Sequence, residues 1–242
     1  MIDIRRFPDA QDAAAAAADL IIARLQAKPD LVLGVATGAT MVPVYRLLVA
    51  AHRAGTANFE RMRCFSVDEY VGLPPTDKAS FRATMATHFY DPIGIAPARC
   101  FVPDAMAADL QAAAQQYEAA LVAAGGIDLL MLGIGTNGHI GFNEPQADLA
   151  GRTCLVDLTA ETLAANANQF DAGTLQPRRA ITMGVATMLD AREILLVATG
   201  AGKRLAIARA LLGPIDPACP ASALQSHPHV VAILDAGAAS GL

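Results

Sequence analysis

The sequence has no tryptophan, few aromatic residues and little charge for its length. Of its 242 residues, 5% are aromatic and 17% are charged, with 23 acidic residues against 18 Lys and Arg. The resulting net charge of −5 argues against nucleic acid as a partner, because binding a phosphate backbone needs a basic patch. It leaves room for one small anionic ligand, which needs only local amides and one or two cations.

Metal-ligand spacing is missing as well. The four cysteines, at positions 64, 100, 154 and 219, are scattered and form no CxxC or Cys/His pair. This pattern excludes a zinc site of the usual spacing and a disulfide scaffold, and predicts reduced, buried thiols.

Long apolar runs are also lacking. Met1–Pro8 does not have the apolar core of a signal peptide, and Ala13–Leu25 is interrupted by Asp19 and Arg24. A membrane-spanning helix needs about 20 apolar residues. We therefore expect a cytoplasmic protein with no membrane partner.

What the sequence does contain is an alternation of short β-rich runs with longer helical ones. Strands are expected at 31–36, 63–67, 127–132, 154–158, 193–198 and 230–234, and helices at 13–25, 40–54, 80–90, 106–124 and 202–212. Such alternation predicts an α/β, doubly wound fold, with a mostly parallel sheet and helices on both faces (a Rossmann-like three-layer arrangement). Because no linker interrupts the pattern, we expect one domain over residues 1–242.

Ligands of such sheets bind beyond the carboxyl ends of the strands. The first candidate segment there is 36–40, where Gly38 permits a tight turn before a helix and the hydroxyls of Thr37 and Thr40 add donors. Helix-start amides can hold a phosphate. The second is 68–73, where Asp68 and Glu69 follow a strand and a carboxylate could act as a general base. A capped turn and a helix-capping carboxylate are the structural alternatives.

The third segment is the glycine-rich loop 133–145. It matches GxGxxG, but Gly141, Asn143 and Pro145 prevent the helix that a dinucleotide site requires. The loop instead brings together Asn137, His139 and Glu144. His139 is the one side chain there with an ordinary pKa near neutrality, and a structural histidine is the alternative.

The fourth segment is 199–203. It is not a Walker A loop, because Val197 replaces the first glycine of that motif. Lys203, on the first turn of a helix, could reach an anion at the strand ends. A solvated lysine is the alternative.

In this order, the four segments resemble the glucosamine-6-phosphate deaminase (glucosamine-6-phosphate isomerase) family from about residue 30 to 236. The most specific matches are DEYVGL at 68–73 and GHIGFNEP at 138–145, with further matches at 190–191 and 220–224. The resemblance implies conversion of glucosamine 6-phosphate and water into fructose 6-phosphate and ammonia, in amino-sugar catabolism that includes N-acetylglucosamine. It implies no cofactor and no metal.

The resemblance also implies roles for individual residues. Asp68 would move a proton between C2 and C1 of the sugar, and His139, assisted by Asn137 and Glu144, would open the ring. The implied phosphate binders are Thr37, Gly38, Ala39, Thr40 and Lys203.

The sequence departs from the family pattern at several positions. Asn137 stands where some relatives have Asp, and Asn168 replaces a phosphate-binding Arg. Arg82, on the helix after the Asp68 segment, is a candidate for the missing cation. The allosteric relatives have basic residues where Cys154 and Val156 stand, so we expect no activation by N-acetylglucosamine 6-phosphate.

Three alternatives stay open. The substrate could be a related sugar phosphate such as galactosamine 6-phosphate. A 6-phosphogluconolactonase would carry Arg where Tyr70 stands, and a non-catalytic sugar-phosphate sensor would not need Asp68, His139 and Glu144 together. The sequence leaves open the exact hexosamine phosphate, how phosphate is held with Asn168, and whether the protein is a monomer or a small homo-oligomer.

Overall fold

The structure is a computed structural model that describes residues 2–170 and 175–242. Its largest sheet has seven strands, all parallel, in the order β1-β10-β9-β6-β2-β3-β5. The strands are β1 (Asp3–Phe7), β10 (Val230–Asp235), β9 (Glu193–Ala198), β6 (Leu129–Leu132), β2 (Val32–Val35), β3 (Arg63–Ser66) and β5 (Cys100–Phe101). The predicted doubly wound, mostly parallel fold is confirmed.

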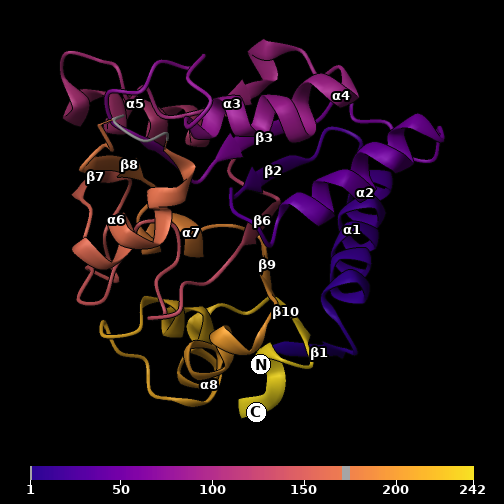
Figure 1. The fold of residues 1–242 in the computed structure, drawn as a ribbon. Coiled ribbons are helices and arrows are strands. Elements are labelled where there is room, and N and C mark those ends of the chain that lie inside the picture. Colours follow the sequence, from indigo (N-terminus) through magenta and orange to yellow (C-terminus); the bar gives the residue numbers. More distant parts are fainter. Residues whose placement is uncertain (1, 171–174) are drawn as a thin grey trace.

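Helices cover both faces of this sheet, because alternate side chains of each strand belong to different cores. Leu33 and Leu195 point into one core, and Leu130 and Leu196 into the other. The first core is covered by α1 (Ala10–Ala27), α2 (Val42–Arg53) and α4 (Asp91–Ile93), and the second by α5 (Leu110–Ala123), α7 (Val185–Leu189) and α8 (Arg204–Leu212). Figure 1 shows α1 and α2 lying along one side of the strands.

A second sheet was not predicted. It is small and antiparallel, with the order β4-β8-β7, and consists of β4 (Asp68–Tyr70), β8 (Arg179–Thr182) and β7 (Cys154–Asp157). Helix α6 (Ala160–Asn166) follows β7, and both lie on the side of the molecule away from α1 and α2 (Figure 1). The expected strand 154–158 therefore exists, but it does not belong to the parallel sheet.

Several other boundaries differ from expectation. The helix expected at 80–90 is α3 (Phe81–Met85) followed by a π-helical turn (Ala86–Tyr90), and α5 begins at Leu110 because the side chain of Asp109 caps it. Short 3₁₀ helices are found at Pro97–Arg99, Ala167–Gln169, Ala201–Lys203, Pro220–Ser226 and Ala238–Gly241. Among the described residues, no helix is both long and apolar enough to cross a membrane.

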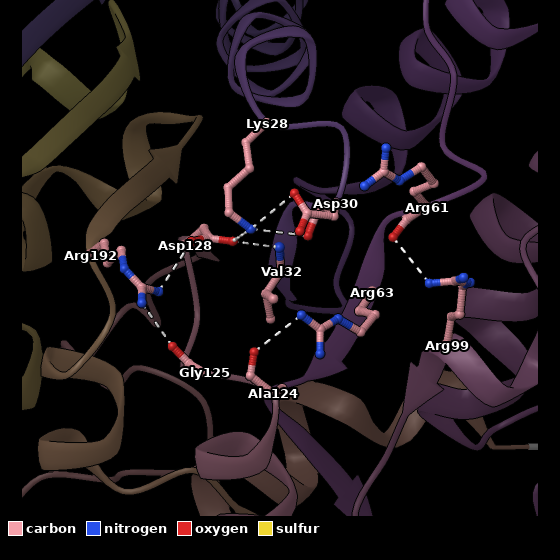
Figure 2. Close-up of polar contacts among 10 residues, drawn as sticks. All are labelled: Lys28, Asp30, Val32, Arg61, Arg63, Arg99, Ala124, Gly125, Asp128 and Arg192. Carbon is pink, nitrogen blue, oxygen red and sulfur yellow. Dashed lines mark hydrogen bonds and ion pairs between the residues drawn. The ribbon is translucent and has the colours of Figure 1, made fainter.

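The amino edge of the large sheet is joined by the amino-edge cluster, defined as Lys28, Arg63, Asp128 and Arg192 (Figure 2). The Asp128 carboxylate accepts the Val32 N–H at 2.8 Å and pairs with Lys28 Nζ at 2.9 Å and Arg192 Nη1 at 3.1 Å. Two carbonyls after α5 accept from arginines: Ala124 from Arg63 and Gly125 from Arg192. The starts of β2, β3, β6 and β9 are thereby tied together.

Candidate active site

The four segments singled out in the sequence follow four neighbouring strands. Segment 199–203 follows β9, 133–145 follows β6, 36–40 follows β2 and 68–73 follows β3, and these strands are adjacent in that order. The direction in which the chain adds strands reverses between β2 and β6, which is where an open α/β sheet forms its ligand crevice. The predicted convergence of the four segments at one edge is confirmed.

Asp68 lies where the chain passes from the large sheet into the small one. The strand β3 ends at Ser66, and Asp68 begins β4, opposite Thr182 of β8. The Asp68 side chain is buried, with 7% exposure for the residue, and no described residue gives its carboxylate a hydrogen bond. Burial, reinforced by the charge of Glu69, raises the pKa of Asp68 to about 8. A carboxyl with a pKa near the operating pH suits proton transfer in both directions.

Glu69 is buried too, but its carboxylate is fully occupied. It accepts the backbone N–H groups of Tyr70, Phe81 and Arg82 at 2.8–2.9 Å, two of them at the start of α3. Burial raises the pKa of Glu69, and the amides oppose that rise. Glu69 is therefore a helix cap, and Asp68 is the member of the pair that is free for chemistry.

His139, Glu144 and Asn137 come together in the loop after β6. Nδ1 of His139 lies 3.6 Å from Oε2 of Glu144, and the same Oε2 accepts from Asn137 Nδ2 at 2.9 Å. The Asn137 Oδ1 in turn accepts the His139 backbone N–H at 3.2 Å. Glu144 thus faces the ring of His139, and Asn137 holds both partners.

The charge of Glu144 is stabilised in place. Burial by itself would raise its pKa, but contacts from His139, Thr162 and Asn137 outweigh it and lower the pKa to about 2. Two carboxylates at one edge, Asp68 and Glu144, therefore have pKa values pushed far apart. Such a separation is typical of sites in which one acid exchanges protons and the other stays ionised.

Glycines allow this loop to fold closely on itself and on the small sheet. A Cβ on Gly135 would lie 2.2 Å from Cε1 of His139, and one on Gly141 would lie 2.8 Å from Oγ1 of Thr182. The Phe142 N–H donates to that same Oγ1 at 3.1 Å. Because Thr182 is also the partner of Asp68 in the small sheet, it links the His139 loop to the Asp68 strand.

The turn after β2 is open. Gly38 has a φ of 128°, and a Cβ there would meet nothing within 4 Å. Helix α2 follows without a side-chain cap and has Pro43, which lacks an N–H, in its first turn. The remaining N–H groups of that turn are available to an anion. Gly38 and Ala39 are exposed, and Thr37 and Thr40 are partly exposed.

Lys203 stands on the 3₁₀ turn after β9. Its half-buried ammonium has no carboxylate partner among the described residues, and burial lowers its pKa. Gly200, with a φ of 90°, donates its N–H to both oxygens of Asp235 at 3.0 and 2.8 Å. Asp235, at the end of β10, thereby fixes the turn that carries Lys203.

Arg82 is placed differently from the other phosphate candidates. Its Nη1 donates to the backbone carbonyl of Cys100 on the edge strand β5 at 3.0 Å. Asn168, where the family resemblance implies an arginine, is exposed. Among the described residues, no group of three His, Cys, Asp or Glu side chains could hold a metal ion.

Comparison with known proteins identifies the family. The model of the glucosamine-6-phosphate isomerases/6-phosphogluconolactonase family matches residues 8–232. The chain belongs to this family.

Relatives within the glucosamine-6-phosphate isomerase family include two glucosamine-6-phosphate deaminases. The one from Rhodopirellula baltica is 48% identical, covering 99% of this chain and 96% of its own, and that from Streptomyces coelicolor is 46% identical, covering 97% and 90%. A solved monomeric glucosamine-6-phosphate deaminase superposes with a TM-score of 0.96 at 36% identity over the whole of both chains. The 6-phosphogluconolactonase of Trypanosoma brucei shares the fold, with a TM-score of 0.79 at 20% identity over 100% and 99%.

Three residues of the candidate site were not found from the sequence. They are Thr162, which donates to Glu144, Thr182, which links the two sheets, and Asp235, which holds the Lys203 turn. Asp235 had a signal, because it directly follows an expected strand. The threonines had none, since their partners lie 18 and 40 positions away in the chain.

Proposed function

We propose that this chain converts glucosamine 6-phosphate and water into fructose 6-phosphate and ammonia. The proposal rests on two groups at one edge of the sheet. Asp68 is a buried carboxylate to which no described residue donates a hydrogen bond, and His139 is a histidine held by the ionised carboxylate of Glu144. Aldose–ketose isomerisation with ring opening needs both a carbon base and an acid/base at the ring oxygen.

In the first step His139 opens the ring. A proton passes from the anomeric hydroxyl to the ring oxygen, the bond between C1 and that oxygen breaks, and an aldehyde forms at C1. Glu144 and Asn137 hold His139 in place for this transfer. A carboxylate that stays ionised at neutral pH, as a pKa of about 2 provides, suits the role.

In the second step Asp68 takes the proton from C2 and returns it to C1. A proton also passes from the nitrogen to the aldehyde oxygen, which leaves a hydroxymethyl group at C1 and an imine at C2. Water adds to the imine and ammonia leaves, giving the ketose. Each positioned proton transfer of this kind accelerates the reaction on the order of 10²–10⁴-fold, and none of the steps uses a cofactor.

At the other end of the substrate, we assign the phosphate to the open turn after β2 and to Lys203. The group consists of Thr37, Gly38, Ala39, Thr40, Lys203 and Arg82. Among the described residues, the Arg82 guanidinium makes one hydrogen bond, from Nη1 to the Cys100 carbonyl. Its other N–H groups can therefore supply the second cation that Asn168 does not.

The relatives support this substrate over the alternatives. Those at 44–48% identity are deaminases of glucosamine 6-phosphate, whereas the 6-phosphogluconolactonase likeness, at 17–20% identity, reflects the fold alone. We further propose that residues 1–242 act as one domain, as a cytoplasmic monomer or small homo-oligomer in amino-sugar catabolism, without nucleic-acid or membrane partners.

The test is ammonia release from a panel of glucosamine 6-phosphate, galactosamine 6-phosphate and unphosphorylated glucosamine, with lactone hydrolysis of 6-phosphogluconolactone in parallel. We expect the highest kcat/KM for glucosamine 6-phosphate and no loss after exhaustive chelation. A higher kcat/KM for another substrate would reassign the specificity. A rate lost to the chelator and restored by a divalent metal would contradict the cofactor-free mechanism.

A further inference from the structure

The two oxygens of Glu144 have different partners. Oε2 faces His139 Nδ1 and accepts from Asn137, whereas the one donor to Oε1 among the described residues is the hydroxyl of Thr162. Glu144 reaches these partners through a side chain with three rotatable torsions. A contact on Oε1 therefore acts together with the Asn137 bond on Oε2 to keep Oε2 directed at His139.

Thr162 is built to hold that contact. It lies in α6, is 4% exposed, and its hydroxyl makes its one described hydrogen bond with Glu144. Its backbone N–H is fixed by the N-cap hydroxyl of Thr159 at 3.2 Å. A β-branched side chain has few rotamers in a helix, so the direction of the hydroxyl follows from the position of α6.

Helix α6 is itself anchored near the site. Leu158, just before the N-cap of α6, and Leu163, within the helix, pack with Tyr70 and Phe142 in one apolar cluster. Tyr70 belongs to the Asp68 strand and Phe142 to the His139 loop. The hydroxyl of Thr162 is thus carried on a helix that touches both halves of the proposed machinery.

We propose that Thr162 is a positioning residue that acts through Glu144 on His139, an inference that rests on the proposed function. By donating to Oε1, the hydroxyl keeps the carboxylate ionised and turned toward Nδ1 of His139. Nδ1 then carries the hydrogen, and Nε2 is left as the nitrogen that exchanges protons with the sugar. Loss of the hydroxyl slows ring opening and leaves proton transfer by Asp68 intact.

The variants are Thr162→Val, which removes the hydroxyl with little change of shape, and Thr162→Ser, which retains it. Thr187→Val is the matched control, because Thr187 is equally buried at 4% and donates to the carboxylate of Glu118, which lies outside the proposed machinery. A hydrogen bond to a charged group predicts a fall in kcat of roughly 10- to 100-fold for Thr162→Val. We expect KM to stay within about threefold, Thr162→Ser to recover most of kcat, and Thr187→Val to match wild type.

The deuterium isotope effect at C2 of glucosamine 6-phosphate distinguishes slower ring opening, which the positioning role predicts, from a simple loss of folded enzyme. If ring opening has become slow, the effect measured on kcat for Thr162→Val falls toward unity. If the variant merely contains less folded enzyme, kcat falls and the isotope effect keeps its wild-type value. That second outcome, or a kcat within twofold of wild type, would overturn the proposal.

The nitrogen-15 shifts of the His139 ring give a readout that needs no turnover. We expect one tautomer, with the hydrogen on Nδ1, in wild type and Thr162→Ser, and a mixture in Thr162→Val. An unchanged tautomer in Thr162→Val overturns the positioning role even if no sugar phosphate is consumed. Absence of ammonia release by wild type, with the tautomer shift present, would instead refute the proposed function.

Discussion

Asp128 and Asp68 are both largely buried carboxylates beside strands of the large sheet, one at its amino edge and one at its carboxyl edge. Asp128 accepts a backbone N–H and pairs with Lys28 and Arg192. Asp68 has no such partner among the described residues, and its pKa is raised to about 8. A buried carboxylate that accepts several hydrogen bonds stabilises the fold. A buried carboxylate without donors has a raised pKa, so it binds a proton near neutral pH, and its ionised form destabilises the fold.

The same contrast separates the cations of the two edges. At the amino edge Arg63 and Arg192 donate to carbonyls at the end of α5 (Figure 2). At the carboxyl edge Lys203 has no carboxylate partner among the described residues, and burial lowers its pKa. Among the described residues, charged groups without a partner, rather than charge itself, thus distinguish the carboxyl edge of this sheet from the amino edge.

The largest expected effect is on turnover. Asp68→Asn should lower kcat on the order of 10²–10⁴-fold or more, because the amide cannot accept the C2 proton, while binding of fructose 6-phosphate is largely spared. Ammonia release and isothermal titration measure the two quantities. Wild-type turnover in this variant would remove Asp68 from the mechanism. The lack of donors to its carboxylate would then have no link to catalysis.

The next effect is on pH dependence. A base must be unprotonated in the free enzyme, so a pKa of about 8 for Asp68 predicts that kcat/KM rises about tenfold per unit of pH up to that value. The profile should be measured from pH 6 to 9 and corrected for the substrate's amino group, titrated separately by NMR. A flat profile between pH 6 and 8 would show that Asp68 is already ionised there.

The third prediction asks whether Arg82 contributes to phosphate binding at the carboxyl edge of the sheet. Arg82→Ala should raise KM by roughly 10- to 100-fold, the value of a charge-assisted hydrogen bond, with kcat little changed because binding of the phosphate is common to ground and transition states. Arg192→Ala, at the amino edge, is the control and should leave KM unchanged. An unaltered KM in Arg82→Ala would assign this arginine to its bond with the Cys100 carbonyl alone.

The smallest effect is on the free energy of unfolding, and it tests the contrast between Asp128 and Asp68 most directly. Asp128→Asn should lower the free energy of unfolding by about 1–3 kcal/mol, since donors lose a charged acceptor, which corresponds to a fall in Tm of roughly 2–4 °C per kcal/mol. Its kcat and KM should match wild type.

Asp68→Asn should have the opposite sign. The folded pKa of about 8 lies above the ordinary value of about 3.9, so the folded state binds more protons between these values and wild type loses stability as pH rises through them. The amide does not titrate, so this variant should exceed wild type in Tm most clearly at pH 8–9. A lower Tm there would contradict the assignment of Asp68 as an uncompensated buried acid.

The sequence was most informative where strands are buried on both faces. The runs at 129–132 and 193–198 are almost wholly apolar, and their strand assignments held to within two residues. The edge strand β1, with the sequence DIRRF, was missed because its side chains are mostly exposed and give no apolar run. The strands β4 and β8 were missed because each is short, and β4 depends on a partner more than 100 positions away in sequence.

For the site, the sequence predicted which residues meet but not how each is held. The glycine-rich loop after β6 and the acids after β3 could be found from their position next to strands. That Glu69 caps α3 while Asp68 stays free depends on the path of the chain after residue 70, and no local pattern encodes it. Thr162 could not be found because its partner Glu144 is 18 residues distant and on another element.

Val67 lies between the two sheets, after β3 ends at Ser66 and before β4 begins at Asp68, and it is hydrogen-bonded to both sides. Its N–H donates to Val35 of the large sheet at 2.9 Å, and its carbonyl accepts from Met183, beside β8, at 2.8 Å. The large sheet can form from βα units that are neighbours in sequence. The small sheet requires β4 to pair with β8, more than 100 positions away in sequence. Pairings between such distant segments form slowly during folding. We therefore expect the burial of Asp68, which is unfavourable, to come late in folding, after the large sheet has formed. In a refolding experiment, recovery of activity should accordingly lag behind recovery of the helical signal.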